Sequence, residues 1–153
     1  ASVAKMGKRY DGGAAKKKSK RAPRSASESN RVRHLLSLDA ELGRKRLAAK
    51  QDEAVGLFSR LRTREALIEL CRADFTSAPF AELAKLEPKE QAATAAFHEV
   101  LHELRWYVSY TEDMPSTVKL TVSQYVRRLD ELHHALRVTL GPPEALGHRV
   151  IDA

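Results

Sequence analysis

Residues 92–110 read AATAAFHEVLHELRWYVSY, and the large apolar side chains of this stretch recur every three or four positions. Such spacing places them on one side of an α-helix, which buries that side against another element. The apolar stripe consists of Ala93, Phe97, Val100, Leu101, Leu104 and Val108. Pro88 is suited to the first helical position, where a missing N–H costs nothing. The sequence therefore predicts a helix of about 88–111.

A second apolar stripe of the same kind follows after a short break. It consists of Val118, Val122, Tyr125, Leu129, Leu132 and Leu136. In the intervening TEDMPST (111–117), Pro115 interrupts the first helix and Ser116 is available as the N-cap of the next. Gly141, followed by two prolines, ends the second helix. Two long helices with a short loop predict an antiparallel helical hairpin of about 88–111 and 116–140.

The residues ahead of the hairpin also favour helices. Ser25 to Glu28 resemble a capping box, so we expect a helix to begin there. One stripe is expected to hold most of Val32, Leu35, Leu36, Asp39, Leu42 and Leu47, and a second periodic run consists of Ala54, Val55, Phe58 and Leu61. The polar stretch 44–53 indicates that the helix is exposed or interrupted near Gly43. Thr63 can cap a further helix over 64–73, and APFAELAKL (78–86) reads as a short helix.

Composition agrees with these patterns. The chain has 153 residues, of which 42% are hydrophobic and 6% aromatic, and Ala, Leu, Glu, Arg and Lys dominate. These residues favour helix, and the length is enough for one core. We predict an all-α fold, a helical bundle that contains the long hairpin and is preceded by a basic, extended N-terminal tail. The expected division is a tail of 1–28 and a single α-helical domain of 29–153.

The net charge of +7 is concentrated in this tail. Residues 1–34 contain eleven Lys and Arg against two acidic residues, a balance of +9, whereas the remaining 16 basic and 18 acidic residues balance at −2. With almost nothing to bury, residues 1–28 are expected to be intrinsically disordered or ordered by a partner. The residues expected to contact an anionic partner are Lys8, Arg9, Lys16, Lys17, Lys18, Lys20, Arg21 and Arg24.

Several partners suit such a tail. It could neutralise the phosphates of RNA or DNA, dock on an acidic protein or lipid surface, or act as a nuclear import signal. A purely solubilising tail is the alternative. No apolar run is long enough to span a bilayer, and the N-terminus lacks the apolar segment of a secretory signal. We expect an intracellular protein. A start at Ala1 rather than Met favours a mitochondrial or other organellar assembly, with the nucleus and cytoplasm left open.

The stretch HEVLH (98–102) matches H-E-x-x-H, in which two His hold a zinc ion and the Glu activates its water. On a helical wheel with Phe97 at zero, His98 falls near about 100° and His102 near about 140°, away from the hairpin's core. An outward helix face supplies neither a third ligand nor a cleft that excludes water. We interpret the motif as fortuitous. A zinc hydrolase with His98, Glu99 and His102 at its metal site remains the third functional hypothesis.

Trp106 falls opposite the apolar stripe on the same wheel, with His102 and Tyr110 beside it. One reading is that the first helices cover this face, so that Trp106 belongs to the core. The other is that His102, Trp106 and Tyr110 form a protein interface, because large aromatic side chains are enriched at interface centres. On either reading this helix is contacted on two sides.

The remaining candidate residues have simpler explanations. His133 and His134 diverge by about 100° on a helix and are expected on its surface or flank, although either could serve as a third zinc ligand. Cys71 is the only cysteine, which excludes an intrachain disulfide and a zinc site built from cysteines. It shares a face with Leu67, which favours a buried, inert thiol. We expect no cofactor.

These observations favour a non-catalytic, α-helical accessory subunit or adaptor of a large assembly. Its neutral helical body would pack against other protein subunits, and its basic tail would contact RNA, such as ribosomal RNA, or an acidic protein or lipid surface. A nucleic-acid-binding protein of the ribosome, nucleus or nucleoid is the second hypothesis. The body's balance of −2 predicts that residues 30–153 alone do not bind nucleic acid.

Overall fold

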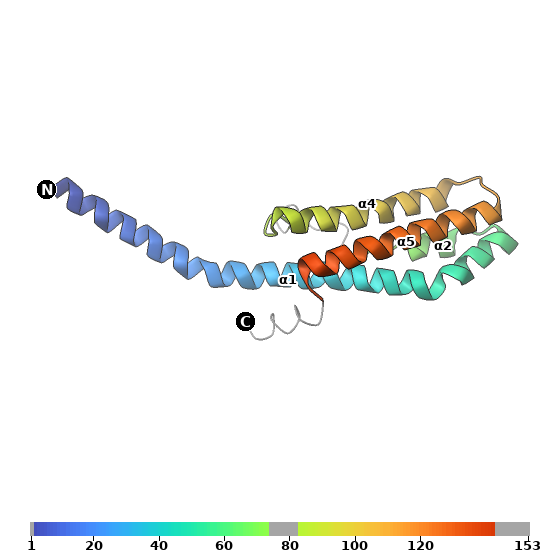
Figure 1. Cartoon of the computed structure of the whole chain (residues 1–153), viewed down its shortest axis with the longest axis horizontal. Helices are drawn as coiled ribbons and strands as arrows, with labels where there is room; N and C mark the ends of the chain where they lie inside the picture. The colour runs from blue at the N-terminus through green and yellow to red at the C-terminus, as the bar shows by residue number, and fades with distance from the viewer. Residues whose placement is uncertain (1, 74–82, 143–153) are drawn as a thin grey trace.

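The computed structural model describes residues 2–73 and 83–142, with side chains from residue 28 onward. Within this range it contains the helices α1 (Ser2–Leu61), α2 (Glu65–Leu70), α4 (Pro88–Tyr110) and α5 (Pro115–Leu140). No strand occurs among these residues, so the predicted all-α class is confirmed. Figure 1 shows α4 and α5 beside the C-terminal part of α1, whose N-terminal part projects beyond the bundle. None of the described helices is long and apolar enough to cross a membrane.

Helix α4 begins at Pro88, as its sequence predicts, and its apolar stripe faces the bundle. Glu87 and Glu90 form a capping box that satisfies main-chain N–H groups of the first turn. The buried side chains are Phe97, Val100, Leu101, Leu104 and Val108, whereas Ala93 is half-buried. Burial of this stripe against α5 is the main contact of α4.

Helix α5 runs antiparallel to α4 because only residues 111–114 connect the two (Figure 1). The prediction that Ser116 is its N-cap is wrong: Met114 occupies that position and Pro115 is the first helical residue. The proline fits there because its fixed φ suits the first turn and the absent N–H has no partner to lose. The end at Gly141 is as predicted, since this residue adopts a φ of 100° that favours glycine.

Helix α1 corrects two predictions and decides between the alternatives of a third. It begins at Ser2 rather than near Ser25, so the backbone of residues 2–28 is helical and not extended. Of the two alternatives for residues 44–53, the helix is largely exposed there and is not interrupted at Gly43. Once residues 29–61 are helical, each further Ala, Lys or Arg extends the helix without a new nucleation step. Gly43 is itself buried on the bundle side, between Ala40 and Leu47, where packing outweighs the low helix propensity of glycine.

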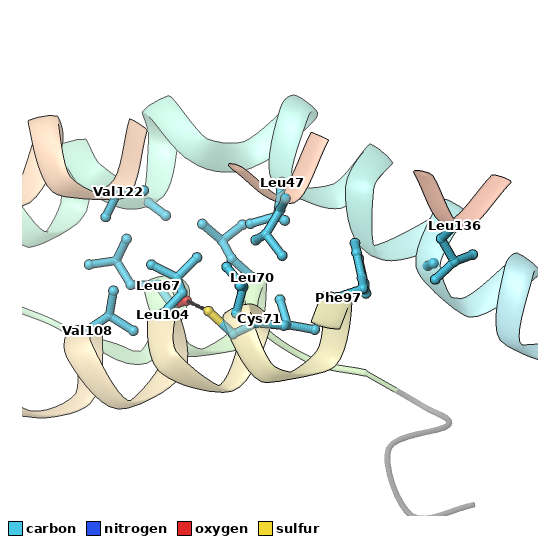
Figure 2. Close-up of a cluster of buried hydrophobic side chains, with 14 of the residues drawn as sticks. Leu47, Leu67, Leu70, Cys71, Phe97, Leu104, Val108, Val122 and Leu136 are labelled. Atoms are coloured by element: carbon cyan, nitrogen blue, oxygen red, sulfur yellow. Dashed lines mark hydrogen bonds between the residues drawn. The ribbon is translucent and has the colours of Figure 1, made fainter. Parts of the chain in front are cut away.

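The core lies where α1, α2, α4 and α5 meet, and Figure 2 shows its central part. Leu47 from α1, Leu67 from α2, Leu104 from α4 and Val122 from α5 are all at most 2% exposed. Leu136, which is fully buried, extends this core toward the other end of α5. A single apolar cluster therefore joins the hairpin to the two preceding helices.

Helix α2 is shorter than predicted, and its N-cap is Arg64 rather than Thr63. The Arg64 side chain donates hydrogen bonds to main-chain oxygens at the end of α4, and these bonds position the start of α2. Of the short helix expected over 78–86, residues 78–82 lie outside the described residues. Leu86 at its end is buried in the common core.

Candidate functional site

Trp106 and Tyr110 form an exposed aromatic pair on the outer face of α4. Their side chains are 69% and 67% exposed, and their ring centroids lie 5.4 Å apart with the planes tilted by 52°. His102, one turn earlier, is also exposed. Helices α2 and α5 contact the opposite side of α4. The reading that Trp106 belongs to the core is therefore wrong, because the first helices cover the other face.

The end of α4 that carries this pair is held by polar contacts. The Arg64 guanidinium donates hydrogen bonds to the main-chain oxygens of Val108 at 3.1 Å and Thr111 at 2.6 Å. These carbonyls belong to the last turn and its cap, which lack partners within the helix. The Tyr107 hydroxyl donates to the Asp113 carboxylate at 2.7 Å and so ties the same turn to the following loop. The aromatic pair thus stands on a fixed platform and not on a loop.

The two histidines of HEVLH lie in different surroundings. His98 Nδ1 donates to the main-chain oxygen of Thr94 at 3.0 Å, and its Nε2 lies 3.5 Å from Asp39 of α1. Only 13% of the His98 side chain is exposed, whereas Glu99 and His102 face solvent. Across residues 28–73 and 83–142, no group of three or more His, Cys, Asp and Glu is arranged to hold a metal ion. His98 thus joins α4 to α1.

Of the two predicted positions, surface or flank, His133 occupies a flank of α5 and is buried there, with 4% exposure. Its Nε2 lies 2.9 Å from Oε2 of Glu41, and Arg137 lies 3.6 Å from the same oxygen. Burial lowers the pKa of His133, and the nearby Glu41 carboxylate opposes this effect in part. The helical wheel of the hairpin missed the site because α1 covers this flank of α5. His134, its neighbour, is exposed as expected.

A second buried contact joins α1 to the start of α4. The Arg33 guanidinium donates to both carboxylate oxygens of Glu90, at 2.6 and 3.0 Å, and Glu90 is only 4% exposed. Burial alone would raise the pKa of Glu90, but the hydrogen bond from Arg33 and the capping bond to the Glu87 N–H leave that pKa lowered. Two-point contacts of this kind fix orientation as well as distance. The Arg33–Glu90 pair therefore sets the register of α1 along the hairpin.

Cys71 is buried, as its spacing from Leu67 predicts. The Sγ atom donates to the main-chain oxygen of Leu67 at 3.5 Å, drawn as the dashed line in Figure 2. Burial raises the pKa of the thiol to about 12. Because the thiolate is the reactive form, this cysteine is inert at neutral pH.

The basic residues of the tail, from Lys8 to Arg24, lie on the helical backbone of α1, but their side chains fall outside what the structure describes. Figure 1 shows that this part of α1 and the end of α4 with the aromatic pair lie at opposite ends of the molecule. The structure thus brings His102, Trp106 and Tyr110 together and keeps the basic segment apart from them.

Comparison with known proteins adds no relative. No protein-family profile matches the chain, and neither a curated protein nor a solved structure matches it.

Proposed function

We propose that this protein is a non-catalytic, α-helical accessory subunit or adaptor of a multi-subunit assembly. The observation that carries the proposal is the Trp106–Tyr110 pair, which is exposed on a platform held by Arg64. Exposed aromatic side chains on a rigid helix are typical of interface centres, since their burial by a partner is favourable and costs little conformational entropy. In this proposal the pair anchors another protein subunit.

The basic segment supplies the second contact of the proposal. Residues 1–34 carry a balance of +9, and the helix that contains them extends away from the bundle (Figure 1). A charged helix without a core of its own gains stability from an anionic partner. Contacts at both ends of the molecule would let the protein join two parts of one assembly, which is the task of an adaptor.

The alternative is a nucleic-acid-binding protein, which the charge of the same segment favours. The two functions differ in what copurifies with the chain after nuclease treatment. The test is affinity purification of the full-length protein from its native cells, with and without nuclease, followed by mass spectrometry. An accessory subunit retains a defined set of proteins after nuclease treatment. Loss of every copurifying protein on that treatment contradicts the proposal and supports nucleic-acid binding.

A further inference from the structure

Helix α1 carries apolar side chains on two faces. Val32, Leu36 and Ala40 face the bundle and are at most 4% exposed. Most of the stripe predicted for this region does turn inward, since Val32, Leu36 and Leu47 are buried and the Asp39 side chain is 8% exposed. Its other two members, Leu35 and Leu42, point away from these residues and are 40% and 46% exposed. Leu38 lies between them, half-buried and outside the common core. We name Leu35, Leu38 and Leu42 the outer stripe.

The outer stripe has the spacing of a helix-pairing seam. Its positions i, i+3 and i+7 correspond to a, d and a of a heptad and span about 10 Å along the axis. Lys45 stands at the next d position and exposed Ala49 at the next a position. A helix that is apolar on two opposite faces is normally covered on both. The hairpin covers only the inner face, so the outer stripe suits a further helix.

The charges around the outer stripe are sorted by sign. The acidic residues of this part of α1 turn inward: Asp39 faces His98 and Glu41 faces His133, with side chains 8% and 14% exposed. Among the cations, Arg31 is exposed and the Lys45 side chain is 66% exposed, whereas Arg33 turns inward to Glu90. The same helix continues into the basic N-terminal segment. Arg31 and Lys45 occupy the d positions directly before and after the outer stripe, so positive charge stands at both of its ends.

From this arrangement we infer that the outer stripe binds an amphipathic helix with acidic flanks, contributed by a partner protein. Leucines of the partner would pack on the outer stripe, and its Glu or Asp residues would pair with Arg31, Lys45 and the basic segment. The inference rests on the proposed adaptor function and names the chemistry of one partner.

Two other occupants fit less well. A second copy of this chain brings like charges together in either direction. Parallel pairing sets Arg31 against its equivalent, and antiparallel pairing centred on Leu38 sets Arg31 against Lys45. RNA would use the cations but gains nothing from aliphatic side chains, because its contacts are made through phosphates and stacked bases.

The test uses a fluorescein-labelled heptad peptide of about 28 residues with Leu at a and d and Glu at e and g. It is titrated into the full chain and binding is followed by fluorescence anisotropy. We expect saturable binding that Leu38→Asp or Leu42→Asp weakens by about tenfold or more. The matched control is Leu120→Asp on α5, a leucine 60% exposed outside the outer stripe, which should bind as the wild type does. Circular dichroism establishes that each variant is folded.

A second comparison isolates the charges. A peptide with Lys at e and g should bind about tenfold or more weakly than the Glu peptide, and the Arg31→Glu/Lys45→Glu variant should narrow or reverse that preference. Absent binding of the Glu peptide, equal binding of both peptides, or binding unaffected by Leu38→Asp would each overturn the inference. So would a wild-type dimer that Leu42→Asp dissociates in sedimentation equilibrium, or competition by single-stranded RNA that Leu42→Asp abolishes.

Failure of this inference and failure of the adaptor function give different results. The peptide experiment measures binding at the outer stripe alone, whereas copurification after nuclease treatment detects partners bound anywhere on the molecule. If the chain does not bind the Glu peptide but retains its copurifying proteins, the adaptor function stands and the inferred partner helix does not.

Discussion

The two faces of α4 have the same helical backbone and opposite environments. On one face Phe97, Leu104 and Val108 are each 1% exposed, and on the other Trp106 and Tyr110 are 69% and 67% exposed. Burial of the first set stabilises the fold by removing apolar surface from water. The second set would release the same kind of free energy only if a partner covered it. One periodic stretch can therefore specify a core on one side and an exposed aromatic surface on the other.

The largest expected effect lies on the buried face. Phe97→Ala removes a fully packed ring that also meets the imidazoles of His98 and His133 edge-on. We expect the free energy of unfolding to fall by about 3–5 kcal/mol, since the lost burial is joined by a cavity. Urea denaturation measures this loss. The matched variant is Trp106→Ala, with an expected change of about 0.5 kcal/mol or less. Equal losses in the two variants would remove the distinction between the faces.

The next effect tests the platform between the faces. Arg64→Met removes the two hydrogen bonds to the main-chain oxygens of Val108 and Thr111. We expect a loss of about 1–2 kcal/mol in urea denaturation, because hydrogen bonds from a charged donor to part-buried carbonyls are lost. Arg60→Met is the control, since Arg60 is exposed and donates to the Gly56 carbonyl of its own helix at 3.4 Å. An Arg64 variant as stable as the Arg60 variant would show that the end of α4 needs no such support.

A smaller effect concerns pH. The pKa of His133 is lowered in the folded chain, mainly by burial, from an ordinary value of 6.5. The unfolded chain therefore binds a proton more readily than the folded chain below about pH 6.5, and stability falls as the pH drops through that range. Glu41, Arg44 and Arg137 are the charged groups that face this histidine.

The measurement is urea denaturation at about pH 7.5 and pH 5.5, on either side of this range. His133→Gln should reduce the difference in stability between the two values, while His134→Gln, at the exposed neighbouring position, should leave it as in the wild type. An unchanged difference in His133→Gln would contradict the assignment.

The smallest effect is a gain in stability away from both faces of α4. Arg62 adopts a φ of 59°, and its N–H bonds to the Phe58 carbonyl at 3.0 Å as α1 ends. Glycine adopts this conformation at lower cost, so Arg62→Gly should raise the free energy of unfolding by about 0.5 kcal/mol, after loss of the weak cation–π contact with Phe58. A destabilised variant would indicate that the Arg62 side chain contributes more than its backbone costs.

The sequence anticipates contacts set by local periodicity and misses those between distant segments. Pro88, Gly141 and the apolar stripe of α4 are predictable because each depends on spacing within one helix. His133 is buried because α1, which carries Glu41, packs against α5. Leu42 is exposed because the hairpin does not cover that face of α1. No period within α5 or α1 encodes these relations. Trp106 shows the same limit, because its spacing placed it opposite the core but could not decide whether α1 covered it.

The length of α1 could not be predicted for a different reason. Read locally, Ser25 favours a helix start, and Gly43 with the polar stretch 44–53 leaves an exposed helix and an interrupted helix as alternatives. In the folded chain, Leu47 within that stretch and Ala54 directly after it are both buried in the common core, which keeps the helix in register across it. Tertiary packing therefore overrides local propensity in α1.

We propose that the outer face of α4 serves recognition and not folding. The decisive measurement is quantitative copurification of the full-length Trp106→Ala/Tyr110→Ala variant, compared with Leu120→Ala, which truncates an exposed apolar side chain on α5. We expect the aromatic double variant to lose at least one defined protein partner that Leu120→Ala retains, with both variants as stable as the wild type. If the folded double variant retains every partner, the outer face of α4 does not serve recognition.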